Sequence, residues 1–100
     1  GAANLLPDRT TLAMVWRYLA AAISPISDTP MCLCRKIVRW SGLPLTLGQL
    51  LTCLDIFADV KLLTLQQKSK YITIHLTAPS GKADLSTSRT MQRLLQAKES

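Results

Sequence analysis

A change in the spacing of apolar residues predicts an α+β fold for this chain. Apolar residues recur at the 3.6-residue period of buried helix faces up to Val60, and at every second residue in the segments that follow. The chain has 100 residues, of which 48% are hydrophobic and 18% charged, so we expect one domain with a sizeable core. We assign residues 1–6 to an N-terminal tag or linker and residues 7–98 to this domain.

Three helices are expected before the period changes. The first begins after Asp8, whose carboxylate can accept hydrogen bonds from the free amides of a first turn. The second covers residues 29–41, with a proline in its first turn. The third covers residues 47–59, and Thr46 and Gln49 match the capping-box pattern at its start. The residues predicted to be buried are Leu12, Val15, Trp16, Leu19 and Ile23, then Leu33, Ile37 and Trp40, then Leu47, Leu50, Leu51, Leu54 and Phe57.

The outward face of the first helix is poor in charge. Between residues 10 and 23 its only charged residue is Arg17, while Met14 and Ala21 are expected to point outward. Such a face either packs against another part of a larger protein or reflects the helix preference of alanine, and both alternatives stay open. A break at residues 24–28 follows this helix.

The alternating segments predict a β-hairpin and a winged-helix-like fold. Residues 63–65 and 71–76 alternate apolar with polar side chains, and the polar residues 66–70 connect them. A loop is expected at residues 77–82. Three helices, with a helix-turn-helix among them, a two-stranded β-hairpin wing and a C-terminal helix form the predicted fold. The C-terminal helix is expected at residues 88–98, with inward-facing Met91, Leu94 and Leu95.

The sequence contains no pattern typical of an enzyme or a metal site. Hydrolysis requires a nucleophile with a base, paired carboxylates or an open metal site. His75 lies on the polar face of a strand without a second ligand near it, and Cys32 and Cys34 point in different directions on a helix. We interpret Asp55 and Asp59, one helical turn apart, as solvated residues. We therefore expect no catalytic residue, no metal ligand and no cofactor in this fragment.

Cysteine usage and hydropathy favour a cytoplasmic protein that does not contact membranes. Three cysteines without framework spacing argue against a disulfide-stapled secreted domain. The longest apolar stretch, residues 12–23, is interrupted by Arg17 and is shorter than the ~20 residues of a membrane span. The N-terminal residues also lack the pattern of a signal peptide.

An excess of positive charge is the main functional feature of the sequence. Twelve Lys and Arg against six Asp and Glu give a net charge of +6, which suits phosphate backbones or acidic proteins. The third helix, which would enter the major groove in a helix-turn-helix protein, carries only Asp55 and Asp59 as charges. Cations on the second helix and the wing can hold phosphates without recognising bases, although a solvated basic surface without a ligand is an alternative. The candidate nucleic-acid-binding residues are Arg35, Lys36, Arg39, Lys61, Lys68 and Lys70.

The two tryptophans have two possible roles in a basic protein of this kind. Trp16 and Trp40 both fall on the apolar stripes of predicted helices. We therefore interpret both as core residues rather than as platforms on which nucleic-acid bases stack.

Three short strings and the order of the elements resemble a known family. The strings are Pro7-Asp8-Arg9, then residues 51–57 with the apolar pair 62–63 behind them, and finally Lys82-Ala83-Asp84-Leu85-Ser86-Thr87-Ser88. The last is similar to the Lys-x-Asp-Leu-x-x-Ser string that closes the family's domain. Over residues 7–95 the chain resembles the C-terminal domain of RecJ, the single-stranded-DNA-specific exonuclease, in its Gram-positive-type form.

The resemblance implies an accessory role in DNA recombination and repair. The parent enzyme would degrade single-stranded DNA from the 5′ end with magnesium or manganese held by Asp-His-His-type motifs, and none of these motifs occurs in this chain. The implied partners are single-stranded DNA or the DNA backbone, bound weakly, the remainder of the parent exonuclease, and an acidic repair protein. The alternative is a free-standing winged-helix DNA-binding transcription regulator, against which the acidic third helix argues.

Overall fold

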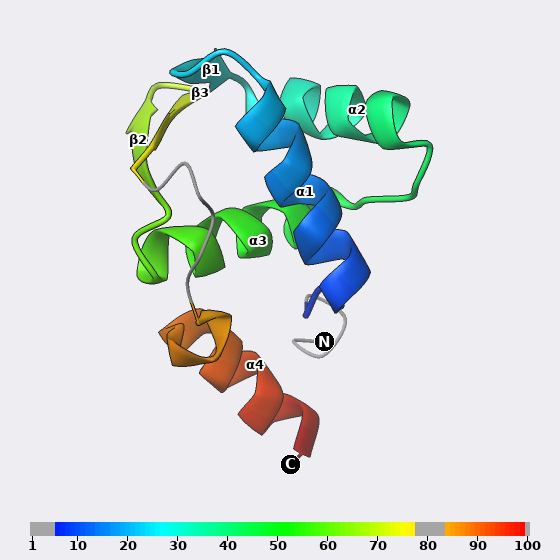
Figure 1. The fold of residues 1–100 in the computed structure, drawn as a ribbon, viewed down its shortest axis with the longest axis vertical. Helices are drawn as coiled ribbons and strands as arrows, with labels where there is room; N and C mark the ends of the chain where they lie inside the picture. The colour runs from blue at the N-terminus through cyan, green and yellow to red at the C-terminus, as the bar shows by residue number, and fades with distance from the viewer. Residues whose placement is uncertain (1–5, 78–83, 100) are drawn as a thin grey trace.

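Four α-helices and a three-stranded antiparallel sheet make up the structure (Figure 1). The computed structural model describes residues 6–77 and 84–99, with side chains up to residue 97, so the linker at residues 1–5 and most of the expected loop at residues 77–82 lie outside it. The layout is α+β and winged-helix-like with a C-terminal helix, as predicted. In chain order the elements are α1 (Arg9–Ala21), β1 (Ile26–Asp28), α2 (Pro30–Ser41), α3 (Leu47–Asp59), β2 (Leu63–Lys68), β3 (Tyr71–Leu76), the short 3₁₀ helix η2 (Leu85–Thr87) and α4 (Arg89–Glu99).

The first three helices begin where their capping residues predict. The side chains of Asp8, Thr29 and Thr46 each accept a hydrogen bond from the backbone amide three residues later, at 2.8, 3.2 and 3.1 Å. Gln49 completes the capping box by accepting from the amide of Thr46 at 3.1 Å. Helix α2 ends at Gly42, whose φ of 71° lies in the left-handed region that glycine adopts without steric cost. Local side-chain chemistry therefore fixes these boundaries.

Helix α3 is the centre of the core. It contacts α1, α2, β2, η2 and α4 (Figure 1), and its side chains are buried around more than one stripe because neighbours cover it from several sides. The prediction for Leu51 is wrong, since this side chain is exposed. The residues of α3 that are buried are Leu50, Thr52, Cys53, Leu54, Ile56 and Phe57.

The buried face of α1 differs from the predicted stripe at both ends. Met14, expected to point outward, is only 6% exposed, because α1 packs against α2 as well as α3. Ile23, expected to be buried, is 91% exposed because α1 ends at Ala21. Ala21 is exposed as predicted. Trp16 is half-buried and packs edge-on against Phe57, with ring centroids 5.4 Å apart.

Two further apolar residues lie at the surface against expectation. Trp40, in the last turn of α2, is 53% exposed, although Tyr18 of α1 packs against its ring with centroids 5.6 Å apart. Leu95 is exposed because α4 packs mainly with α3 and η2 and projects away from the rest of the domain (Figure 1). The helical period of apolar residues alone had predicted that both side chains are buried.

The sheet contains a strand that the sequence analysis missed. Strand β1 pairs antiparallel with β3 from Ile26↔Ile74 to Asp28↔Ile72, so β3 lies in the middle of the order β1-β3-β2. The break expected at residues 24–28 is therefore partly a strand, and the two-stranded wing has a third member. A strand of three residues is too short to show a period of two.

The last residue of α3 anchors α4. Asp59 Oδ2 accepts hydrogen bonds from Ser88 Oγ at 2.7 Å and from the amide of Thr90 at 3.0 Å. The fully buried Ser88 hydroxyl in turn accepts from the amide of Met91 at 3.2 Å and so caps α4. Asp59 is exposed, as expected of a solvated residue, and it also has this structural role. Ser88 belongs to the string at residues 82–88 that resembles RecJ. In that string Asp84 caps η2 by accepting from the amide of Ser86 at 3.0 Å, while Lys82 and Ala83 lie outside the described residues.

The two aspartates of α3 have opposite pKa shifts. Burial alone raises the pKa of Asp59, but the hydrogen bonds from Ser88 and Thr90 outweigh it and hold the pKa below its ordinary 3.8. Burial, and then the charge of Asp59, raise the pKa of Asp55 above that value. The ionised form of Asp59 therefore stabilises the fold, whereas that of Asp55 does not.

We predict that Asp59→Ala lowers the free energy of unfolding at pH 7 by about 1 kcal/mol, the usual cost of a lost helix cap. The pKa of Asp59 is lowered on folding, so its contribution is present above 3.8 and is lost as the pH falls through the folded pKa. Urea unfolding at pH 7 and at a pH below 3.8 measures this. The difference in the free energy of unfolding between wild type and variant should be smaller at the lower pH. Asp55→Ala is the matched control and should leave stability at pH 7 unchanged or slightly raised. Equal losses for both variants would contradict the anchoring role of Asp59.

Candidate nucleic-acid interface

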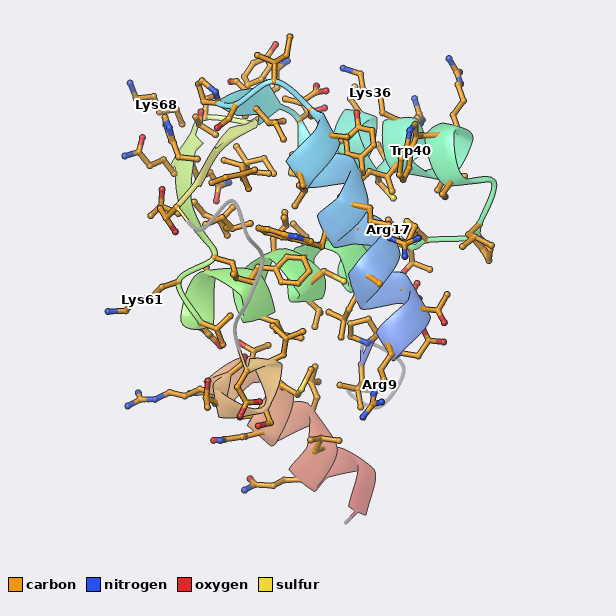
Figure 2. The ribbon with its side chains drawn as sticks, viewed as in Figure 1. Arg9, Arg17, Lys36, Trp40, Lys61 and Lys68 are labelled. Atoms are coloured by element: carbon orange, nitrogen blue, oxygen red, sulfur yellow. The ribbon has the colours of Figure 1, made fainter. Side chains whose placement is uncertain are left out.

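The structure distributes the six predicted cations over different parts of the surface. Lys68 ends β2 and pairs with Tyr71 at the hairpin tip, while Lys70 lies in the turn between β2 and β3. Lys36 lies near the same end of the molecule, whereas Lys61 lies beside the end of α3 (Figure 2). The set is therefore not one continuous patch.

Arg35 and Arg39 form the clearest pair among the predicted residues. Both are exposed and lie one turn apart on α2, so their side chains share one face of the helix. They line a hollow of about 580 Å³ between α2 and the start of α3. The other side chains that line it are apolar and belong to Met31, Cys34, Val38, Leu45 and Leu47.

Lys36 and Lys61 differ from the other four candidate residues because each makes a contact within the fold. The ammonium of Lys36 lies 2.7 Å from Asp28 Oδ2, and this hydrogen bond raises the pKa of Lys36. It is the only ion pair within residues 6–77 and 84–97, and it joins α2 to β1. Lys61 turns the chain from α3 into β2 with a φ of 62°, and its carbonyl accepts a hydrogen bond from Thr77 Oγ1. Both residues therefore contribute to the fold whether or not a ligand binds.

Helix α3 presents no cation to a ligand. Between α3 and β2 lies a hollow of about 270 Å³ that contains the Asp55 carboxylate. Its lining includes Gln66 and Gln67 of the wing but no Lys or Arg. A phosphate approaching this face would meet a negative charge, so recognition of bases by α3 is disfavoured.

A second arginine pair was missed by the sequence analysis. Arg9 and Arg17 lie on α1 and line a groove with Trp40, at the end of α2 (Figure 2). This groove, named the α1–α2 groove here, has a volume of about 570 Å³. Arg9, Ala13 and Arg17 follow one another at intervals of four residues, which places all three on one helix face. This spacing could have predicted the arginine pair from the sequence. The residues lining the groove are Arg9, Thr10, Ala13, Met14, Arg17, Trp40, Ser41 and Leu43.

The thiols and the histidine form no metal centre in the described part of the chain. No three His, Cys, Asp or Glu side chains there lie close enough together to hold a metal ion. Cys34 is buried and its thiol donates a hydrogen bond to the carbonyl of Leu45 at 3.3 Å, whereas Cys32 is exposed. Burial, and then the charge of Asp8, raise the pKa of Cys53 to about 12. The buried thiols therefore belong to the core.

Comparison with known proteins assigns no family to the chain. No family model, no curated protein and no solved structure matches it. Among residues 6–77 and 84–99, no helix has the length and apolar composition needed to cross a membrane. The resemblance to RecJ therefore rests on the sequence strings, in which Asp8, Asp84 and Ser88 act as helix caps.

We predict that one thiol of the native protein reacts rapidly with a disulfide reagent at pH 8, namely the exposed Cys32. Burial raises the pKa of both Cys34 and Cys53, so they present little thiolate and should react only after unfolding. Absorbance of the released chromophore counts the thiols, and Cys32→Ser should abolish the rapid phase. Two or three rapid thiols would show that the core around α3 opens readily.

Proposed function

We propose that the chain is a non-catalytic accessory domain that contacts the DNA backbone within a RecJ-type single-stranded-DNA exonuclease of recombination and repair. The observation that supports contact with DNA is the position of four arginines, Arg35 and Arg39 in one hollow and Arg9 and Arg17 in the α1–α2 groove. Among the described residues, no acidic side chain lines either hollow. A guanidinium group suits phosphate because it donates two parallel hydrogen bonds. The assignment to RecJ rests on the sequence resemblance.

The proposed contact is weak and does not depend on base sequence. Phosphate contacts position a protein on nucleic acid but carry no sequence information. The helix that would recognise bases is buried over much of its surface and exposes Asp55. Affinity on the order of 10 μM or weaker at physiological salt is typical of such contacts. The same features disfavour a sequence-specific transcription regulator, which would place α3 in the major groove.

A second candidate function is docking on protein, either the remainder of the exonuclease or an acidic repair protein. It is favoured by exposed apolar side chains beside the same arginines. Met31 lies in the hollow of Arg35 and Arg39, and Leu43 in the α1–α2 groove. Interfaces with protein commonly combine apolar contacts with arginine.

We predict that Arg35→Ala with Arg39→Ala flattens the salt dependence of binding to a single-stranded oligonucleotide. Each phosphate contact contributes about 0.7 to the slope of log affinity against log salt, so the slope should fall by up to about 1.4. Fluorescence anisotropy at several salt concentrations measures it. Arg89→Ala with Arg93→Ala removes the same charge from exposed positions on α4, away from that hollow, and should change the slope less. Equal flattening would indicate a solvated basic surface without a defined contact.

We also predict that the purified chain does not degrade labelled single-stranded DNA in the presence of magnesium or manganese. The proposal assigns hydrolysis to motifs of the parent enzyme, so gel electrophoresis should show an intact oligonucleotide after prolonged incubation. The positive control is a RecJ exonuclease of full length. Degradation that co-purifies with the chain through successive columns would contradict an accessory role. Separately, the coding sequence upstream of the fragment should encode Asp-His-His-type motifs if the parent is RecJ.

A further inference from the structure

An exposed aromatic side chain lies in the α1–α2 groove together with two cations. Trp40 is 53% exposed, whereas the other tryptophan, Trp16, packs against the core residue Phe57. Figure 2 shows Trp40 of α2 near Arg17 of α1, with Arg9 further along α1. Since the described side chains that line the groove include two arginines and no acid, its charge favours an anionic ligand.

The indole of Trp40 is held in place before any ligand arrives. Tyr18 of α1 packs against it with ring centroids 5.6 Å apart and an interplanar angle of 73°. This edge-to-face contact restricts the orientation of the indole while leaving about half of the side chain open to solvent. Binding on a side chain that is already oriented loses little conformational entropy.

The two arginines lie along one line on α1. They are eight residues apart, which corresponds to about 12 Å along a helix that rises about 1.5 Å per residue. A ligand that extends along the groove can thus contact both guanidinium groups. Thr10 and Ser41 add hydroxyl groups to the lining.

We propose that the α1–α2 groove binds unpaired nucleotides, with a base stacked on Trp40 and phosphates further along the strand held by Arg17 and Arg9. The inference rests on the proposed nucleic-acid function and deepens it by assigning a preference for single strands. Single-strand-binding proteins combine a basic groove with aromatic side chains on which bases stack. In a duplex the bases are already stacked on one another, so Trp40 cannot reach their faces without unstacking them.

The groove is also adjacent to the other arginine-lined hollow along α2. Trp40 follows Arg39 in the sequence, and these two residues line the hollows on the two sides of α2. A strand that leaves Trp40 across the end of α2 can therefore reach the guanidinium of Arg39. The extended basic track favours a nucleic-acid strand over an acidic peptide, which would need an enclosed apolar pocket for its anchoring side chain.

The test compares single and double strands with the full chain and variants of Trp40. Anisotropy is measured with a labelled oligothymidylate and with a labelled duplex hairpin. Wild type should prefer the single strand. Trp40→Ala should weaken single-strand binding about five- to a hundredfold, as for loss of one stacked base, and change duplex binding less than about twofold. Trp40→Phe, which keeps an aromatic face, should restore most of the lost affinity and shows that the fold is retained.

Two controls separate stacking from general effects. Tyr71→Ala removes another exposed aromatic side chain, 47% exposed at the hairpin, and should leave the preference for single strands unchanged. Tryptophan emission provides a second readout. Oligothymidylate should quench the emission of wild type but not that of Trp40→Phe, in which only Trp16 emits.

The outcomes distinguish this inference from the function on which it rests. Salt-dependent binding that is equal for single and double strands and indifferent to Trp40→Ala overturns the stacking site but leaves backbone contact standing. Absence of binding to either nucleic acid at low salt overturns both. Binding of a synthetic acidic peptide that contains a phenylalanine, in the absence of oligonucleotide binding, also overturns both and supports protein docking.

Discussion

Burial of α3 is the constraint on which the rest of the structure depends. Helices α1, α2 and α4, strand β2 and η2 all pack against it, and six of its side chains are buried. A helix enclosed in this way supplies the core but has little surface left for a ligand. What remains outside is negative or apolar, with Asp55 and Leu51 as examples. Ligand binding is therefore expected to shift to α1 and α2, which carry four of the exposed arginines.

Much of the fold is predictable because the ends of its helices are determined by contacts between residues close in the sequence. Asp8, Thr29 and Thr46 cap helices through contacts that span three residues, so sequence spacing is sufficient to find them. The hydrogen bond between Asp59 and Ser88 joins residues 29 positions apart, and no spacing rule connects them. Strand β1 was missed for a related reason, because three residues become a strand only when β3 lies beside them.

The candidate interface was predicted in part. Periodicity places Arg35 and Arg39 on one helix face, and the structure adds the apolar hollow that they border. Whether an apolar face is covered depends on where its neighbour ends, which is a tertiary property. Trp40 was therefore assigned to the core, although in the last turn of α2 half of it is exposed.

The anchoring of α4 implies that stability is uneven across the domain. Because α4 packs mainly with α3 and η2 and its N-terminus is held by Asp59 and Ser88, it can open without disturbing the sheet or the two hollows beside α2. Such a segment behaves as a separate cooperative unit, with amide hydrogens that exchange through local opening rather than through global unfolding. Exchange in the C-terminal helix is thus expected to be faster than in α1 and α2.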